Sequence, residues 1–216
     1  AADVLRNPAF PESEFEQLRT QAITGMEASR FEPGAIAGRA LAQYFDPWPA
    51  GHPLRNRTLD ESLAELKALK LEDVRAFHRD FYGTAHGEIA IVGDFDAGAV
   101  RAQLEQLFAG WKSGKPFASI PTQYTDVAAK QARFETPDKP NAVLLARHNL
   151  PLKVTDADYP ALVVANRIFG GGALKSRLGD RIRQQEGLSY GVSSGVRADD
   201  SRDGSDDNGS FSIQAI

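Results

Sequence analysis

The stretch that most constrains the fold is residues 168–192, IFGGGALKSRLGDRIRQQEGLSYGV. Its three consecutive glycines, Gly170, Gly171 and Gly172, give a backbone that can take positive φ and that another segment or a ligand can approach closely. A helix is predicted over residues 173–185, because apolar residues recur four apart on one face, at Leu174, Leu178 and Ile182. Gly187 stands where a C-cap glycine ends a helix. Residues 188–193 then alternate as a strand does.

Arg183, in the last turn of this helix, and Tyr190, just beyond its end, form the candidate site. A guanidinium and a phenol beside a glycine-rich loop can together hold a peptide carbonyl or a developing oxyanion. The spacing also fits a structural role, with Arg183 as a cation at a helix C-terminus and Tyr190 as a half-buried strand residue. Spacing alone leaves both interpretations open.

The same stretch resembles the C-terminal-domain signature of the pitrilysin/insulinase-type zinc metallopeptidases, the inverzincins. In that family an arginine and a tyrosine at this separation help to hold substrate against a zinc site on the opposite domain. Arg183 and Tyr190 match those two positions, so the resemblance implies catalytic roles for both. It also implies that Gly170, Gly171 and Gly172 bind substrate. The parent protein is then a zinc-dependent metalloendopeptidase, and whether this chain alone is an enzyme stays open.

The resemblance extends over nearly the whole chain. Other matching segments are residues 7–10 (NPAF), the loop that ends in His52-Pro53, residues 71–77 (LEDVRAF) with Tyr82, and residues 91–96 (IVGDFD). They are similar to the late part of one family repeat, whereas residues 168–192 are similar to the early part of the next.

The composition excludes several classes of function. The chain has 216 residues, a formal net charge of −4 and a charged fraction of 25%, which are ordinary values for a globular protein. Without a basic cluster, a nucleic-acid groove is not expected. No apolar run approaches the roughly 20 residues that a membrane-spanning helix needs. Because there is no cysteine, disulfides, thiol catalysis and cysteine-based zinc sites are excluded.

Apolar periodicity predicts mostly helices in the first half of the chain and mixed structure in the second. The predicted helices cover residues 11–26, 35–44, 58–69, 70–82, 97–111 and 158–169. The third of them begins with a capping box in which Thr58 is the N-cap and Glu61 is at N3. The predicted strands are a buried one at 87–94 and others at 131–135, 141–147 and 211–216. The aspartate-rich residues 198–208 are predicted to be a solvated hairpin tip, because they lack the glycine and closing glutamate of a calcium-binding EF-hand loop.

Residues 113–126 are predicted to link two α+β units, because they are irregular and contain proline, serine and lysine. Residues 1–112 are then the C-terminal portion of a first peptidase-like unit. Residues 127–216 are the N-terminal portion of a second, homologous unit that carries Arg183 and Tyr190. Each unit is expected to be an α/β-roll, with helices on one face of an antiparallel sheet. We expect both to be incomplete, because the chain lacks an initiator Met and ends inside an apolar alternation at Ile216.

The zinc ligands of the family are not recognisable in this chain. The family takes them from a His-x-x-Glu-His motif and a downstream glutamate. No two of the four histidines are three or four residues apart; they are His52, His78, His86 and His148. Glu27 is the acid nearest the downstream position, but ungapped comparison places Gly25 there. No metal ligand is therefore predicted, and no cofactor is expected in this chain.

Two explanations of the missing motif remain. The motif can precede Ala1 in the parent protein, or this chain can be the metal-free half of a pair in which a partner carries the zinc. Thr20 and Gly25, which stand where acids are expected, favour the metal-free half. The expected partners are a peptide or unfolded-protein substrate and the zinc-bearing half or subunit, and family habit suggests the periplasm or envelope of a bacterium, or else the cytoplasm. The alternatives are a non-catalytic scaffold and a module that binds peptides along a strand edge.

Overall fold

The computed structural model of the chain describes residues 1–201 and 206–216. It combines helices with one antiparallel sheet of three strands, which confirms the predicted α+β class. The chain forms two compact units: residues 1–24 with 64–119, and residues 25–63 with 120–216. The division at residue 119 falls inside the predicted linker, and the three strands all belong to the second unit. That the two units are homologous stays a prediction.

Helices build the first unit. They are α1 (Ala2–Arg6), the first part of α2 (Glu12–Ala28), the last part of α4 (Leu59–Ala68), α5 (Leu71–Phe81) and α6 (Ala97–Phe108). His78 of α5 joins several of these elements, because its Nε2 lies 2.7 Å from the Leu5 carbonyl oxygen and its ring packs edge-on against Phe10. The helices predicted over residues 11–26, 70–82 and 97–111 are confirmed to within the usual uncertainty of helix ends.

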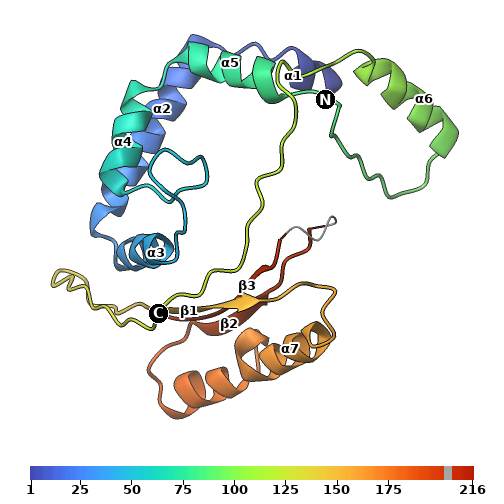
Figure 1. The fold of residues 1–216 in the computed structure, drawn as a ribbon. Helices are drawn as coiled ribbons and strands as arrows, with labels where there is room; N and C mark the ends of the chain where they lie inside the picture. The colour runs from blue at the N-terminus through green and yellow to red at the C-terminus, as the bar shows by residue number, and fades with distance from the viewer. Residues whose placement is uncertain (202–205) are drawn as a thin grey trace. The chain divides into compact units, whose positions relative to one another are not determined.

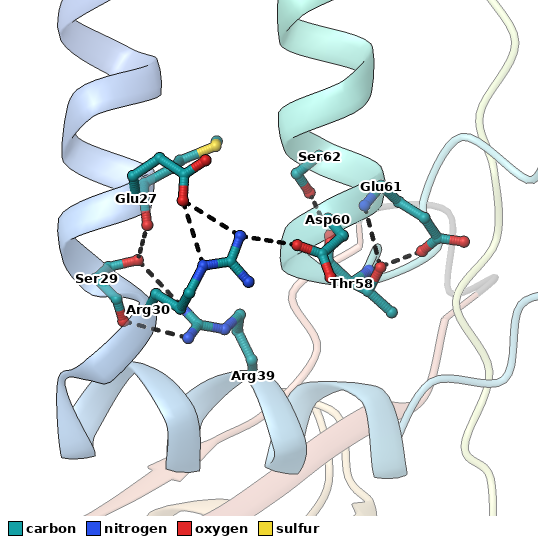
Figure 2. Close-up of polar contacts among 9 residues, drawn as sticks. Glu27, Ser29, Arg30, Arg39, Thr58, Asp60, Glu61 and Ser62 are labelled. Atoms are coloured by element: carbon teal, nitrogen blue, oxygen red, sulfur yellow. Dashed lines mark hydrogen bonds and ion pairs between the residues drawn. The ribbon is translucent and has the colours of Figure 1, made fainter.

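Ahead of its sheet in the sequence, the second unit contains α3 (Pro33–Tyr44) and the adjoining ends of α2 and α4. Figure 2 shows Arg30 between two carboxylates, with its Nη2 donating to Glu27 Oε2 at 3.2 Å and to Asp60 Oδ1 at 2.8 Å. This arrangement joins the end of α2 to the start of α4. It also means that the carboxylate of Glu27 is already paired with an arginine.

The predicted capping box begins α4. The backbone N–H of Glu61 donates to Thr58 Oγ1 at 3.2 Å, and the backbone N–H of Thr58 donates to Glu61 Oε2 at 2.8 Å (Figure 2). These two bonds satisfy N–H groups that the first helical turn cannot pair internally. The hydrogen bond from the Thr58 backbone also holds the pKa of Glu61 below its usual value.

The sheet of the second unit has the order β1-β3-β2, with both pairings antiparallel. Its strands are β1 (Leu144–Pro151), β2 (Val192–Arg197) and β3 (Asn208–Ala215). One face lies against α7 (Tyr159–Asn166) and the turn that follows it (Figure 1). On this face the rings of Phe169 and Phe211 pack at 6.0 Å, and Ser194 Oγ donates to Asn166 Oδ1 at 2.7 Å.

Two predicted strands are wrong. Residues 87–94 and 131–135 have no regular structure, and Val92 is 100% exposed instead of buried. A strand is stabilised by backbone hydrogen bonds to a neighbouring strand, and none of the described residues pairs with either segment. The apolar pattern of these residues indicates strand propensity, but it carries no information about whether a neighbouring strand is present to pair with them.

The acidic residues between β2 and β3 are only partly described, since residues 202–205 lie outside the described residues. The rest are not simply solvated, which corrects that prediction. Asp206 accepts hydrogen bonds from the backbone N–H of Thr122 at 2.7 Å and from its hydroxyl at 3.1 Å. Asp207 accepts one from the backbone N–H of Tyr124 at 2.5 Å. These carboxylates therefore fasten the end of the predicted linker to the second unit.

No helix among residues 1–201 and 206–216 combines the length and the apolar character that crossing a membrane requires.

Candidate functional site

The three glycines lie where α7 runs on into a wide, π-type turn, η2 (Arg167–Gly171), and packs on the sheet. A Cβ on Gly170 would lie 2.7 Å from Leu178 Cδ1 and 2.8 Å from the backbone nitrogen of Ser194. A Cβ on Gly171 would lie 2.6 Å from Asn166 Nδ2, and one on Gly172 would meet the carbonyl oxygen of Lys175. Real Cβ atoms do not approach other atoms so closely, so a side chain at any of the three positions would require neighbouring atoms to shift.

The glycines use their small size and not their freedom at φ. The described glycines with a positive φ are Gly51, Gly93, Gly110 and Gly187, and the triplet is not among them. The predicted close approach is therefore to protein atoms. A role of the triplet in binding substrate stays a prediction.

Gly170→Ala is expected to lower the free energy of unfolding by about 1–3 kcal/mol, because the added methyl group overpacks the contact between the turn and the sheet. Thermal or urea unfolding measures this change. Gly191→Ala is the matched control, since a Cβ there meets nothing within 4 Å. Equal stabilities of the two variants would show that the close approach at Gly170 does not contribute to the free energy of unfolding.

The helix that carries Arg183 begins later than predicted. Ser176 is buried, and its Oγ accepts a hydrogen bond from the backbone N–H of Gly179 at 3.1 Å, as an N-cap side chain does. The main helical segment is η3 (Gly179–Gln185), again of the wider π type. Leu174 precedes the helix and is 89% exposed, so its predicted place on the apolar face is wrong. Ser176 was the signal in the sequence that could have located this start.

The end of the segment is as predicted at Gly187. Its φ of 62° is left-handed, which a glycine adopts without strain. The N–H of Leu188 then donates to the Ile182 carbonyl at 3.0 Å and closes the last turn. The strand begins only at Val192, so residues 188–191 form a connection and not the predicted first part of a strand.

Arg183 lies back across the start of its own helix. Its Nη2 donates to the carbonyl oxygen of Leu174 at 2.8 Å. A Cβ on Gly179 would lie 3.0 Å from the same Nη2, so the absence of a side chain there makes room for the guanidinium. Its Cζ lies 5.6 Å from the centroid of the Tyr190 ring, within the range of a cation–π interaction. One of its five N–H donors is thus engaged with the backbone, and the side chain is held in one direction.

Tyr190 is 86% exposed, although the backbone on both sides of it is fixed. The N–H of Ile216 donates to the Gly191 carbonyl at 3.0 Å and to Ser189 Oγ at 3.2 Å. Among the residues that the structure describes, the phenol hydroxyl has no hydrogen-bond partner. A half-buried strand tyrosine was the structural alternative, and the observed exposure does not fit it.

The structure places Arg183 beside Tyr190, and both side chains keep hydrogen-bond donors that are not engaged with other described residues. An exposed phenol O–H can donate to a carbonyl oxygen on which negative charge builds, and a guanidinium can hold a backbone carbonyl or a carboxylate. Gly170 and Gly171 belong to the π-type turn η2, and the atoms nearest to a Cβ on any of the three glycines do not belong to Arg183 or Tyr190.

The histidines make contacts that suit structural roles. The ring of His52 stacks on Trp48 at 3.9 Å, and that of His86 stacks on Phe117 at 4.4 Å. His148 is exposed on β1. Across residues 1–201 and 206–216 no three His, Cys, Asp or Glu side chains are grouped so that they could hold one metal ion. Since Glu27 is paired with Arg30, the donors present do not fit a zinc site.

Comparison with known proteins gives both family and fold. A family model described as "Peptidase M16 inactive domain" matches residues 68–216. An "Uncharacterized zinc protease" of Rickettsia felis is 24% identical over 195 residues, which are 89% of this chain and 45% of that protein. The "Non-peptidase homolog YmxG" of Helicobacter pylori is 24% identical over 200 residues, which are 88% of this chain and 42% of that protein. The chain thus spans less than half the length of these curated relatives.

A crystal structure described as the peptidase M16 inactive domain from Pseudomonas fluorescens has the same fold, with a TM-score of 0.70 and 24% sequence identity. The comparison covers 99% of this chain and 49% of that one. The family match covers well over half of the chain and includes the glycine triplet, Arg183 and Tyr190. It confirms the resemblance inferred from residues 168–192. This chain belongs to the M16 peptidase family, in the region described as the inactive domain.

Proposed function

We propose that this chain supplies substrate-binding groups, Arg183 and Tyr190, to a zinc-dependent metalloendopeptidase of the M16 family. The observation that carries the proposal is the cation–π pair itself: Arg183 is held 5.6 Å from the ring of a tyrosine that is 86% exposed. A tyrosine with a purely structural role is normally packed, and its hydroxyl finds a partner. Here the ring is steadied by the arginine and the hydroxyl is left available.

The zinc of this proposal lies in another half or subunit, because the donors among the described residues do not fit a metal site. When bound there, zinc would supply the activation of water for peptide hydrolysis. The residues of this chain bind and orient the peptide. Tyr190 donates to the carbonyl oxygen of the bond to be cleaved, and Arg183 holds the neighbouring peptide backbone or a terminal carboxylate. One relative is named a non-peptidase homologue. The competing function is therefore a non-catalytic scaffold, and the experiments must distinguish it from the proposed one.

The proposal predicts that activity and zinc reside with a partner. The purified chain should hold no stoichiometric zinc after dialysis and should hydrolyse no peptide, because its described residues do not group the three protein ligands that a zinc site requires. Mixed with the zinc-bearing half, or within the complete protein, it should support hydrolysis. Elemental analysis and a fluorogenic peptide assay measure both quantities. One tightly bound zinc per chain, or hydrolysis by the chain alone, would overturn the assignment.

A further inference from the structure

The sheet of the second unit has a polar face on the side opposite α7. Side chains of neighbouring residues in a strand point to opposite faces, and Ser194, Phe211 and their register partners face α7. The next register positions therefore face the other way: Arg147 pairs with Ser212, which pairs with Gly195. Eight polar side chains share this face: Arg147 and Asn149 on β1, Asn208, Ser210, Ser212 and Gln214 on β3, and Ser193 and Arg197 on β2.

Arg147 is partly buried and held in one orientation on this face. Its Nε donates to Asn149 Oδ1 at 3.0 Å, and its Cζ lies 5.0 Å from the centroid of the Phe45 ring. Asn149 is itself buried, and its Nδ2 donates to the Thr125 carbonyl at 3.0 Å. The guanidinium is thus positioned by the cation–π contact with Phe45 and the hydrogen bond to Asn149. Its terminal nitrogens have no acceptor among the described residues.

The second cation, Arg197, is exposed at the end of β2. Neither it nor Arg147 forms an ion pair with an acid in the part of the chain that the structure describes. Three acids of the connection between β2 and β3 have other partners: Asp199 accepts from the Ser201 N–H at 2.7 Å, and Asp206 and Asp207 hold the segment 122–124. Burial, and next the charge of Arg197, lower the pKa of Arg147. Two like charges on one face that have no counter-ion among the described residues are stabilised by a bound anion.

A hollow of about 380 Å³ lies on the same face. Ser212 and Gly195, the register partners of Arg147, line it together with Ser193, Gln214 and Leu41 of α3. It offers hydroxyl and amide groups on the face that carries the two cations, and its apolar lining is Leu41, Leu145, Ala146 and Ile213. The serine hydroxyls can act as additional donors to a charged group held by the arginines, and the apolar side chains can contact the chain that carries it.

We propose that this face binds a carboxylate of the peptide substrate, with Arg147 and Arg197 as the cations and Ser212 as a neutral donor. The inference rests on the proposed function, because it takes peptides as the ligands. Arginine matches the planar, two-oxygen geometry of a carboxylate. The face would therefore favour peptides that carry an acidic side chain or a free C-terminus, and it is separate from the pair formed by Arg183 and Tyr190.

Four labelled peptides of one alanine-rich sequence test the proposal on the complete protein. They carry a central Glu or Gln and have a free or an amidated C-terminus, which separates a side-chain carboxylate from a terminal one. The carboxylate-bearing peptides should bind about tenfold tighter than the neutral Gln amide, which corresponds to one charge-assisted hydrogen bond. Arg197→Gln should abolish this preference and leave binding of the neutral peptide unchanged.

Arg133→Gln is the matched control, because Arg133 is exposed and paired with Glu135 away from the sheet. Arg147→Lys tests the buried cation without removing its charge, and the melting temperature shows whether each variant is folded. Equal affinity for acidic and neutral peptides overturns this inference. So does a loss of the preference for acidic peptides in Arg133→Gln that equals the loss in Arg197→Gln. The proposed function fails separately: it requires Arg183→Lys to weaken the Glu and Gln peptides of each C-terminus alike, whatever the central side chain.

Discussion

Tyr190→Phe is expected to lower the peptidase turnover of the complete protein by about two to three orders of magnitude, the usual cost of losing one donor to a developing oxyanion. The substitution keeps the ring, and with it the stacking of Arg183, and removes only the hydroxyl. Because Tyr190 is 86% exposed, the melting temperature should not change. A fluorogenic peptide assay and thermal unfolding, run on the same sample, measure both.

Tyr159→Phe is the matched control for this prediction, since Tyr159 belongs to the same unit and lies at the start of α7. It should leave turnover unchanged. If Tyr190→Phe also leaves turnover unchanged, the tyrosine hydroxyl takes no part in the reaction and the assignment of Tyr190 fails. A fall of turnover in both variants would point to a general sensitivity of this unit.

Arg183→Lys is expected to weaken peptide binding by roughly tenfold to a hundredfold, because hydrogen bonds to charged groups contribute about 1.5–3 kcal/mol. Lysine keeps the charge but loses the planar fork that reaches the Leu174 carbonyl and the Tyr190 ring at once. The KM for a peptide substrate should rise accordingly. Arg181→Lys is the control on the same helical segment, since Arg181 is exposed and pairs with Glu186.

The sequence predicted helices better than strands, for a physical reason. A helix is closed by its own hydrogen bonds and by local end signals, such as the capping box of Thr58 and Glu61 and the left-handed Gly187. A strand depends on a neighbour that can lie anywhere in the chain. The alternation at 211–216 is paired as part of β3, whereas the equally apolar residues 87–94 have no partner among the described residues.

The candidate site was predictable in its members but not in its contacts. The sequence placed Arg183 and Tyr190 seven residues apart around a helix end, and their proximity follows from that. It could not show that the guanidinium turns back to the Leu174 carbonyl, because this depends on the space over Gly179 and on the wide turns of the helix. Nor could it show that Gly170 is pressed against Ser194 of β2, a contact across 24 residues of sequence.

The placement of Arg147 and Arg197 on one face of the sheet could not be predicted from the sequence either. Arg147 and Arg197 are on strands separated by β3, and only the register of the sheet puts them on one face. Their lack of an acidic partner within the described residues becomes visible only after folding. Pattern and spacing therefore find sites built from one stretch of chain, and miss those that a sheet assembles from several.

The central claim is that Arg183 and Tyr190 bind the substrate independently of the zinc chemistry. The most direct test is the affinity of a peptide for the complete protein after a chelator has removed its zinc, measured for the natural protein, Arg183→Lys and Arg181→Lys. The account predicts that the natural protein and Arg181→Lys still bind the peptide without zinc, and that Arg183→Lys binds at least about tenfold more weakly. Binding that disappears with the zinc, or that is equal in all three proteins, would contradict it.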